Sequence, residues 1–287
     1  MNSIGVIGLG LIGGSMAKAI SSHSGITVYG SDASEEIVKR AVAEGVLAGR
    51  LEDHFADIDA LIVALYPTDV VDIILETAPR LKKGCIVIDC TGVKKSICVP
   101  LSEKLSDMGL RFIGGHPMAG KEVAGYANAS ADLFTGASMI LCRDEHTDEG
   151  AVSEASEFFR SIGFSLIKVT DYDTHDRVIA YTSQLAHIVS SAYIKSSTLE
   201  DRYGFSAGSF KDMTRVAKLN EEMWADLFLA NESSIVLQID ELVNHLMEFA
   251  NAIEAGDRDK LVALLRDGRV KKENDELAEE RFKKENA

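Results

Sequence analysis

The chain has 287 residues, of which 46% are hydrophobic and 26% charged, and its formal net charge is −15. This length predicts two domains that each bury a core. The negative charge opposes binding to phosphate backbones and anionic lipid, so we expect no nucleic-acid partner and no membrane role. No apolar stretch approaches the roughly 20 residues that cross a bilayer. The four cysteines form no CxxC pair, which favours reduced thiols and a cytoplasmic protein.

Short β-branched runs alternate with amphipathic stretches up to about residue 170. In chain order the runs are SIGVI, TVYGS, ALIVAL, CIVID, RFIGG, SMILC and SLIKV. This alternation predicts an α/β domain of the Rossmann type, in which helices cover a doubly wound parallel sheet. We assign residues 1–170 to this domain.

Helical patterns replace strand patterns after Asp171. Apolar side chains recur at three- to four-residue spacing along residues 174–194. They are Val178, Leu185, Val189 and Ala192. A second long helix is expected at residues 235–255, where Gly256 would end it and Asp257 would cap the next helix. We therefore predict an all-helical second domain over residues 171–287, whose charged tail forms a solvated helix.

The segment GVIGLGLIGGS follows the first expected strand and opens a helix. Gly8, Gly10 and Gly13 stand in it in GxGxxG register. The first glycine permits a tight turn, the second lets the backbone approach a pyrophosphate, and the third allows close packing of helix on strand. Amides at the helix N-terminus would then receive the phosphate. The alternative, a glycine-rich turn without a ligand, is disfavoured by this context.

Asp32 ends the second expected strand. A carboxylate at this position can accept hydrogen bonds from the adenosine ribose, and it would repel a 2′-phosphate. No arginine follows in the next few positions, so we predict NAD rather than NADP. The expected cofactor-binding residues are Gly8, Gly10, Leu11, Ile12, Gly13, Asp32 and Leu65.

His116 lies in GGHPMAG, directly after the RFIGG run. Ligands of doubly wound folds bind at the carboxyl ends of the strands. A histidine with its ordinary pKa of about 6.5 can accept a proton at neutral pH, so a general base is one interpretation. The other is a histidine that completes a turn beside a proline, and this segment alone does not decide between them.

Two further polar segments lie in the helical half. TSQLAH places Gln184 and His187 beside the apolar stripe, where both could face a cleft, although a lone histidine there is more often a hydrogen-bonded core residue. In FKDMTR, Arg215 offers a rigid pair of donors to a carboxylate. Its alternative is an ion pair with Asp212, three residues earlier.

Together these segments resemble the prephenate dehydrogenase family. The resemblance is carried by GLGLIGGS, DCTGVK, HPMAGKEVAGYANASADLF, TSQLAH and FKDMTR, in this order, and it spans Ile4 to about Gly268. It implies oxidative decarboxylation of prephenate to 4-hydroxyphenylpyruvate with NAD as the hydride acceptor, as part of tyrosine biosynthesis. It also implies a homodimer joined through the helical domains. We expect no metal site.

The resemblance assigns roles to individual residues. His116 would accept the proton of the substrate's ring hydroxyl as hydride leaves the same carbon. His187 and Arg215 would contact the substrate from the helical domain, and Arg215 would hold one of its two carboxylates. Gly120 and Gln184 are further candidates for substrate binding.

The chain departs from the family at two places. It reads TGVK where many relatives read GSVK, so Gly92 stands where their active-site serine stands. Thr91, one residue earlier, is the candidate for supplying the hydroxyl and is counted among the catalytic candidates. TSQLAH replaces SHLPH, which keeps His187 but changes its neighbours.

Three alternatives remain open. Arogenate carries an amino group in place of the side-chain keto group of prephenate and is the nearest rival substrate. A β-hydroxyacid dehydrogenase or a pyrroline-5-carboxylate reductase shares the architecture but relies on other motifs. A non-catalytic NAD-binding sensor of the same fold is favoured only by Gly92, and the retention of His116, His187 and Arg215 argues against it.

Overall fold

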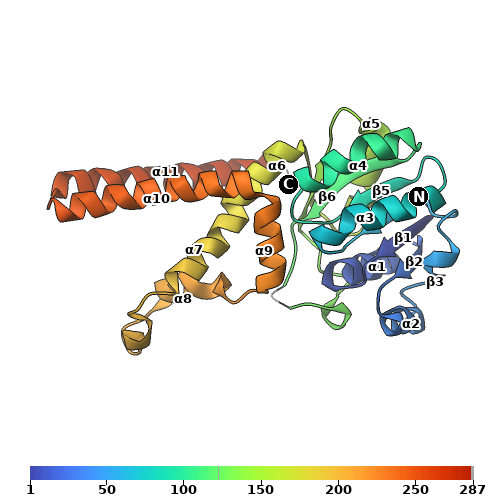
Figure 1. The fold of residues 1–287 in the computed structure, drawn as a ribbon, viewed down its shortest axis with the longest axis horizontal. Helices are drawn as coiled ribbons and strands as arrows, with labels where there is room; N and C mark the ends of the chain where they lie inside the picture. The colour runs from blue at the N-terminus through green and yellow to red at the C-terminus, as the bar shows by residue number, and fades with distance from the viewer. Residues whose placement is uncertain (122, 286–287) are drawn as a thin grey trace. The chain divides into compact units, whose positions relative to one another are not determined.

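The computed structural model describes residues 1–121 and 123–285. A sheet built from the first part of the chain is followed by helices (Figure 1). The chain divides into two compact units, residues 1–232 and 233–287. Our expected domain boundary, after residue 170, differs from this division and coincides with the end of the last strand. It stays a prediction.

The eight-stranded sheet has the order β3-β2-β1-β4-β5-β6-β7-β8. The strands are β1 (Ser3–Ile7), β2 (Thr27–Ser31), β3 (Gly49–Arg50), β4 (Ala60–Val63), β5 (Ile86–Asp89), β6 (Arg111–Pro117), β7 (Ser138–Cys142) and β8 (Leu166–Thr170). The chain order reverses between β1 and β4. Doubly wound folds bind their ligands beyond the carboxyl ends of the strands at such a point.

The seven expected strands are confirmed, and the two-residue β3 is an addition. The expected doubly wound parallel sheet is confirmed, with one exception: β7 runs antiparallel to β6. Over its described residues, the connection between these strands holds one short 3-10 helix, Tyr126–Asn128, and no α-helix. A parallel pair usually needs a helical crossover, so this connection returns the chain in the opposite direction.

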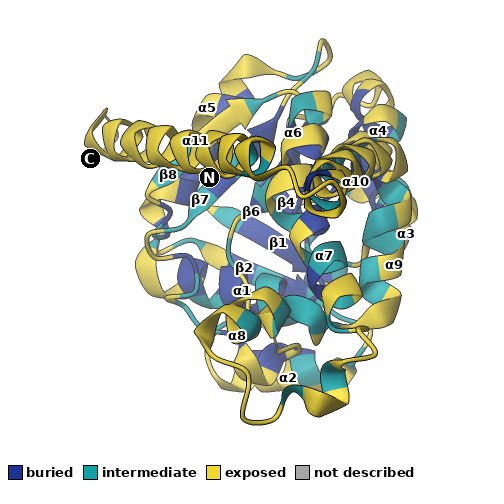
Figure 2. Ribbon diagram, turned by 90° about the vertical axis from the view of Figure 1, so that its left-hand side faces the viewer, coloured by how far each residue is buried: buried dark blue, intermediate teal, exposed yellow. Residues whose placement is uncertain are grey.

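Five helices cover the two faces of the sheet (Figure 2). They are α1 (Leu11–His23), α2 (Glu35–Ala43), α3 (Pro67–Thr77), α4 (Lys95–Asp107) and α5 (Glu149–Ser161). Neighbouring residues of β4 belong to different cores: Ile62 packs in the cluster with α1, α2 and α5, whereas Leu61 and Val63 pack in the cluster with α3 and α4. The uninterrupted apolar run of this strand is therefore explained by burial on both faces.

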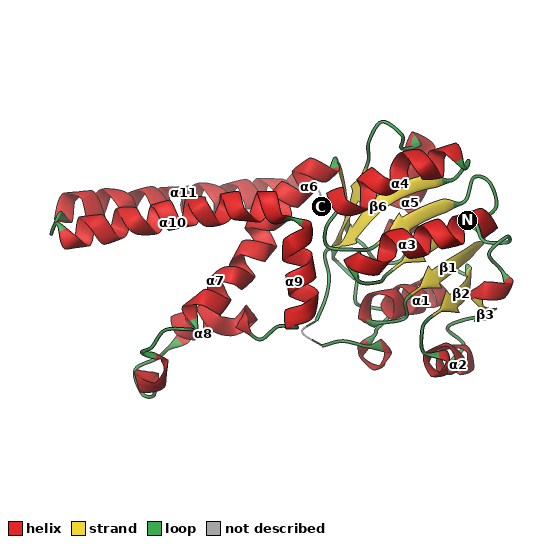
Figure 3. Cartoon of the chain, viewed as in Figure 1, coloured by secondary structure: helices red, strands yellow, loops and turns green. Residues whose placement is uncertain are grey.

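The chain continues into the helical stretch that follows β8 (Figure 3). Its elements are α6 (Tyr172–Ile179), a π-helical turn (Ala180–Gln184), α7 (Leu185–Tyr193), α8 (Gly208–Thr214) and α9 (Glu221–Ala230). The buried positions here are 175, 176, 179, 180, 184, 185 and 190. Their spacing widens across the π turn, which holds an additional residue per turn. The expected apolar stripe is therefore wrong in part, since Leu185 is buried but Val178 is exposed.

The second unit is a helical hairpin. Helix α10 (Glu232–Glu254) ends before Gly256, which adopts a φ of 61°, and α11 (Arg258–Glu285) follows. Asp257 caps α11, since its Oδ1 accepts a hydrogen bond from the amide of Lys260 at 2.9 Å. These expectations are confirmed, although residues 286 and 287 of the expected tail helix lie outside the described residues.

The cysteine and hydropathy expectations can be compared with the structure. Cys85, Cys90, Cys98 and Cys142 are free thiols, and all four are buried. Burial raises the pKa of Cys85 to about 12. Within residues 1–121 and 123–285, no helix combines the length and apolar character that a membrane span requires.

Candidate active site

The loop between β1 and α1 owes its conformation to two of its glycines. Gly8 adopts a φ of 84°, and a Cβ on it would lie 2.4 Å from the carbonyl oxygen of Ala64. A Cβ on Gly13 would lie 1.8 Å from the carbonyl oxygen of Gly8. By contrast, a Cβ on Gly10 would have no other atom within 4 Å. The backbone at Gly10 is therefore accessible to a ligand, as the GxGxxG pattern requires.

The N-terminus of α1 provides donors toward the same space. Gly10 is the N-cap, no side chain caps it, and the first turn carries no acidic residue. The amides of this turn can therefore bind an anion, and the helix dipole favours negative charge there. A phosphate group fits this arrangement.

Asp32 lies at the end of β2 and braces the glycine loop. Its Oδ2 accepts a hydrogen bond from the amide of Leu9 at 2.7 Å, and its Oδ1 accepts one from the amide of Ser34 at 2.9 Å. A carboxylate has about four acceptor sites, so both oxygens retain capacity for ribose hydroxyls. Asp32 thus has a structural role, and its contact with a ribose stays a prediction.

The other cofactor candidates surround this loop. Leu11 and Ile12 form the first turn of α1, Leu65 follows β4, and all three are partly buried. The Cδ2 atom of Leu65 lies 2.7 Å from the place that a Cβ on Gly8 would take. The structure therefore brings Leu65 to the glycine loop, and contact of these residues with a cofactor stays a prediction.

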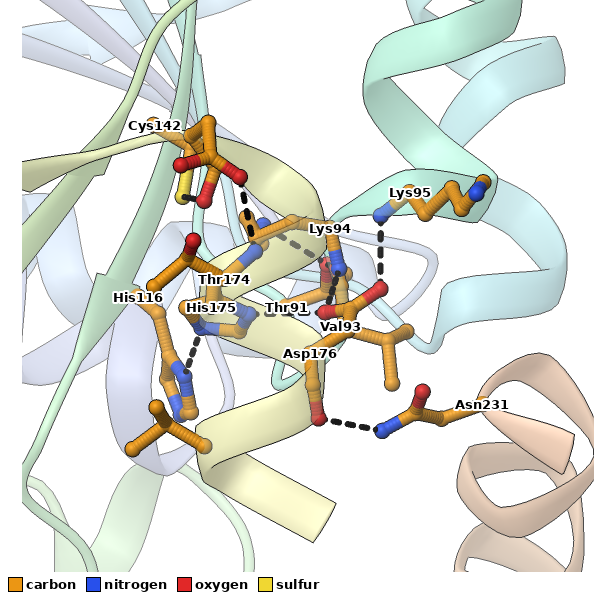
Figure 4. A network of polar contacts seen from close by, with 12 residues as sticks. Thr91, Val93, Lys94, Lys95, His116, Cys142, Thr174, His175, Asp176 and Asn231 are labelled. Carbon is orange, nitrogen blue, oxygen red and sulfur yellow. Dashed lines mark hydrogen bonds and ion pairs between the residues drawn. The ribbon is translucent and has the colours of Figure 1, made fainter. Parts of the chain in front are cut away.

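His116, near the end of β6, begins a chain of hydrogen-bonded side chains (Figure 4). Its Nδ1 lies 2.9 Å from Nε2 of His175, and Nδ1 of His175 lies 2.7 Å from Oδ1 of Asp176. His175 and Asp176 are neighbours on α6, and both are buried. The chain therefore joins the end of a strand to the first helix after the sheet.

Asp176 also caps the N-terminus of α4. Its Oδ1 accepts a hydrogen bond from the amide of Lys94, and its Oδ2 accepts one from the amide of Lys95, both at 2.8 Å. The first backbone amides of a helix have no partner within the helix, and a carboxylate can accept hydrogen bonds from them. Asp176 is therefore held as an acceptor on three sides, by two amides and by His175.

This arrangement determines where the imidazole hydrogens lie. A carboxylate only accepts, so Nδ1 of His175 carries a hydrogen and its Nε2 is an acceptor in the neutral ring. Nδ1 of His116 then donates to that atom, which leaves Nε2 of His116 with a free lone pair. Burial, His175 and Lys94 together hold the pKa of His116 well below its usual value. His116 is therefore neutral at neutral pH and can accept a proton at Nε2.

Gly92 lies beside this basic nitrogen. A Cβ on Gly92 would lie 3.7 Å from Nε2 of His116 and 3.5 Å from Cδ2 of Leu227 on α9. These are ordinary van der Waals distances, so the position has room for a side chain. The TGVK segment therefore places a residue without a side chain directly beside the basic atom.

Thr91 lies on the other side of this segment. Its Oγ1 is 2.7 Å from Oδ1 of Asp89 and 3.0 Å from Nζ of Lys94, and Lys94 pairs with Asp89 in a fully buried ion pair. The structure therefore brings the Thr91 hydroxyl to this ion pair and not to His116. The hydroxyl satisfies buried charged groups, which would be costly to leave unpaired.

Gln184 is buried between helices. Its Nε2 donates to the carbonyl oxygen of Leu227 at 3.3 Å, and its Oε1 accepts from Nδ2 of Asn231 at 2.7 Å. Asn231 also donates to the main-chain oxygen of Asp176 at 2.8 Å. Both ends of the Gln184 amide thus bind protein atoms, and they connect the end of α9 with α6 and the π turn.

His187 lies on α7 against α9. Its Nδ1 donates to the carbonyl oxygen of Ser183 at 2.9 Å, and its ring stacks on Trp224 at 3.8 Å between centroids. Trp224 and Leu227 are one turn apart on α9. One helix therefore contacts both His187 and the Gly92 position beside His116.

The last two substrate-binding candidates are exposed. Arg215 begins a short 3-10 turn, Arg215–Ala217, which packs against α7. Gly120 follows β6, and a Cβ on it would meet nothing within 4 Å. Arg215 thus lies next to the helix that carries His187, whereas Gly120 follows His116 along the chain.

Sequence reasoning missed His175, Asp176 and the buried Lys94. A histidine and an acid stand side by side directly after the last strand, and a lysine follows the acid that ends CIVID. Such pairs are common, and 59 residues separate His175 from His116. The described residues contain no cluster of three or more histidine, cysteine or acidic side chains that could hold a metal ion.

Two family models together match most of the chain. The model described as the nucleotide-binding domain of prephenate dehydrogenase matches residues 16–168, and the model described as its dimerization domain matches residues 171–267. The first contains His116, and the second contains His175 and Asp176.

Similar proteins were found among curated proteins and solved structures. The chain is 33% identical to a cyclohexadienyl dehydrogenase of Zymomonas mobilis over 272 residues, covering 90% of this chain and 91% of that protein. It is 28% identical to a prephenate dehydrogenase of Bacillus subtilis, covering 91% of this chain and 72% of that protein. A crystal structure of prephenate dehydrogenase from A. aeolicus in complex with hydroxyphenyl propionate and NAD+ matches with a TM-score of 0.84 and 26% identity, covering 96% of this chain and 98% of that chain.

Proposed function

Because the chain belongs to the prephenate dehydrogenase family, we propose that it oxidises prephenate with NAD and releases carbon dioxide, giving 4-hydroxyphenylpyruvate. The observation that carries this proposal is the neutral His116, whose Nδ1 is bonded to His175 while its Nε2 keeps a free lone pair. A fixed base with one accepting nitrogen is what the removal of a hydroxyl proton requires.

The residues of the glycine loop fit NAD. The open backbone at Gly10 and the amides of α1 would hold the pyrophosphate, and Asp32 would accept hydrogen bonds from the adenosine ribose. Asp32 would also repel a 2′-phosphate, which favours NAD over NADP. Bound NAD would supply the acceptor for hydride.

The proposed chemistry uses His116 as a general base. As hydride leaves the ring carbon that bears the hydroxyl group, positive charge develops on that carbon and its oxygen. Nε2 of His116 takes the hydroxyl proton and so removes this charge. Loss of the ring carboxylate then makes the ring aromatic.

The helical residues would bind and orient the substrate. Prephenate carries two carboxylates, and we assign one of them to Arg215, whose planar guanidinium can hold a carboxylate with two parallel hydrogen bonds. Nε2 of His187 is free to contact the substrate because Nδ1 donates to Ser183. Gly120 would contribute its exposed backbone. Gln184 would act indirectly, by holding α9 in place.

We assign the apolar residues of the helical hairpin to a homodimer interface. Large apolar side chains are exposed along both helices of this unit. They are Val236, Leu237, Val243, Leu246, Met247, Ile253, Val262, Leu265, Val270, Leu277 and Phe282. The match of residues 171–267 to a dimerization domain supports this assignment. Light scattering after size exclusion should give about twice the chain mass of 31.1 kDa, and a monomer would contradict it.

The experiment that tests the function mixes the purified protein with NAD and either prephenate or arogenate, and follows the absorbance of NADH. We expect NADH from prephenate, at a higher kcat/KM than from arogenate, and little reaction with NADP. If only arogenate gives NADH, then arogenate and not prephenate is the substrate. No NADH with either substrate would contradict the enzyme assignment and favour a sensor.

A further inference from the structure

In the proposed reaction the protein accepts a proton from the substrate hydroxyl and later gives it back to the product. Prephenate carries two negative charges and oxidised nicotinamide one positive charge, while the products carry one negative charge in total. The overall equation therefore neither consumes nor releases a proton. The hydroxyl proton that His116 accepts has to be held while the ring carboxylate leaves, and it then returns to the phenol oxygen.

We propose that the positive charge gained with this proton is held on His175, beside Asp176, and not on His116. This proposal rests on the proposed function. As Nε2 of His116 accepts the hydroxyl proton, the Nδ1–H bond of His116 breaks and an Nε2–H bond forms on His175. Both transfers reverse when the phenol oxygen takes its proton back. The electron pair of the broken C–H bond leaves as hydride, so the relay itself moves only protons.

The geometry supports a transfer in this direction. The two imidazole nitrogens are 2.9 Å apart, and His175 already donates from its other nitrogen to Asp176 at 2.7 Å. A protonated His175 would therefore keep both hydrogen bonds and become the cationic partner of a carboxylate. In a buried site such a pair is far stronger than in water.

The charged groups around His175 come from several elements. Asp176 belongs to α6, Asp89 to β5, Lys94 to the start of α4 and His116 to β6. Lys94 and Asp89 pair with one another, which leaves Asp176 as the carboxylate in direct contact with His175.

The pKa values of both histidines are lowered, and Lys94 contributes to both shifts, but only His175 has a carboxylate that opposes the shift. Burial, His175 and Lys94 all lower the pKa of His116. Burial is also the largest cause acting on the pKa of His175, and it lowers that pKa, but the hydrogen bond to Asp176 opposes the shift. Of the two rings, His175 is therefore the better place for a positive charge.

The substitution His175→Gln separates proton transfer from orientation. Glutamine Oε1 can accept the hydrogen bond from Nδ1 of His116, so it keeps the tautomer, but it cannot take the proton. We expect kcat to fall by about 10- to 100-fold, part of the effect typical of general acid–base catalysis, with the KM values for NAD and prephenate unchanged.

The pH profile gives the decisive reading. In the native protein, acid inactivates the base by placing a proton on the histidine pair, where His175 and Asp176 stabilise the charge. In His175→Gln only His116 can take this proton. Burial and Lys94 still lower the pKa of His116 in this variant, so the acid limb of kcat/KM should move to lower pH. If kcat falls but the acid limb of kcat/KM does not move, His175 only orients His116, and the proposal is overturned. An unchanged kcat would also overturn it.

Asn231→Ala is the matched control. It removes the hydrogen bonds to the main-chain oxygen of Asp176 and to Gln184 but leaves the Asp176 carboxylate in place. We expect a lower Tm and an unmoved acid limb. Equal displacement of the limb in both variants would attribute it to loosened packing and would contradict the relay.

Nitrogen-15 NMR of labelled histidines tests the relay without turnover. In the resting protein we expect hydrogen on Nδ1 of both His116 and His175, and on acidification we expect His175 to gain a proton before His116. The reverse order would overturn the relay even in an active enzyme. If the protein makes no NADH from either substrate, the proposed function fails separately, and the order of protonation can still be read.

Discussion

The glycine loop and the chain of His116, His175 and Asp176 both lie at the carboxyl ends of sheet strands, but they are specified differently. The loop is one contiguous segment whose geometry is set by main-chain sterics, as the 1.8 Å approach at Gly13 shows. The histidine chain joins side chains 59 residues apart. In the loop, fold and binding depend on the same atoms. In the histidine chain, a reactive atom can be changed while the backbone stays in place.

The largest effect should come from His116→Asn. Because this substitution removes the accepting nitrogen, we expect kcat to fall by about 10²- to 10⁴-fold, as for the loss of a general base. The KM for prephenate and the Tm should change little if chemistry and fold are separable here. Steady-state kinetics and calorimetry measure both, and unchanged turnover would refute the role of His116.

Arg215→Gln should separate binding from chemistry in the same way. Loss of a charge-assisted pair costs about 2–3 kcal/mol, so the KM for prephenate should rise by roughly 30- to 150-fold with a smaller change in kcat. Lys211→Gln, on the preceding helix α8, removes a positive charge of the same neighbourhood and serves as the control. An unaltered KM in Arg215→Gln would make that arginine structural, and an equal rise in both variants would indicate a general effect of charge.

Two glycine substitutions test the other half of the comparison. Gly13→Ala forces a methyl group against the main chain of Gly8, so we expect a loss of about 1–3 kcal/mol in unfolding free energy together with weaker NAD binding. Gly10→Ala has open space and should cost only about 0.5–1 kcal/mol, which reflects the poorer N-cap preference of alanine, while its methyl group still hinders NAD. Denaturant titration and calorimetric binding give the two quantities. Unweakened NAD binding in Gly10→Ala would show that the cofactor does not approach there.

Asp59 braces the start of the strand that leads into the glycine loop. Amides of Asn2 and Ser3 and the Lys82 ammonium lower the pKa of Asp59 to about 2. Since the folded pKa lies below the unfolded one, Asp59 stabilises the fold above pH 4, and this contribution is lost as the pH falls toward 2. Allowing for solvent screening, Asp59→Asn should cost about 1 kcal/mol at pH 7. Urea titrations should give a smaller difference near pH 2, and a constant difference would contradict the assignment.

The sequence predicts those structural features that depend only on residues close to one another in the chain. Buried parallel strands are continuous apolar runs, so the seven main strands could be recognised, whereas β3 has two residues and no such pattern. The direction of β7 depends on how the chain packs after β6, which no local signal states. The π turn also escaped prediction, because one additional residue in a turn alters which side chains are buried without any distinctive composition.

The candidate site follows the same rule. His116 could be singled out because it follows a strand in a glycine-rich segment. Its partners on α6 could not, because the contact exists only once the sheet and the helices have packed. Thr91 illustrates the converse, since proximity in sequence suggested a hydroxyl for His116 and the fold directs it to Asp89 and Lys94.

The single carboxylate of Asp176 has a consequence for protein engineering. Hybrid enzymes are usually built by joining segments of relatives at a boundary between domains. A crossover near residue 170 would take Asp176 from one parent and its two amide partners, at Lys94 and Lys95, from the other. A functional hybrid therefore needs a carboxylate at the position of Asp176 from the parent that supplies α6, and non-proline residues at the two donor positions from the other parent.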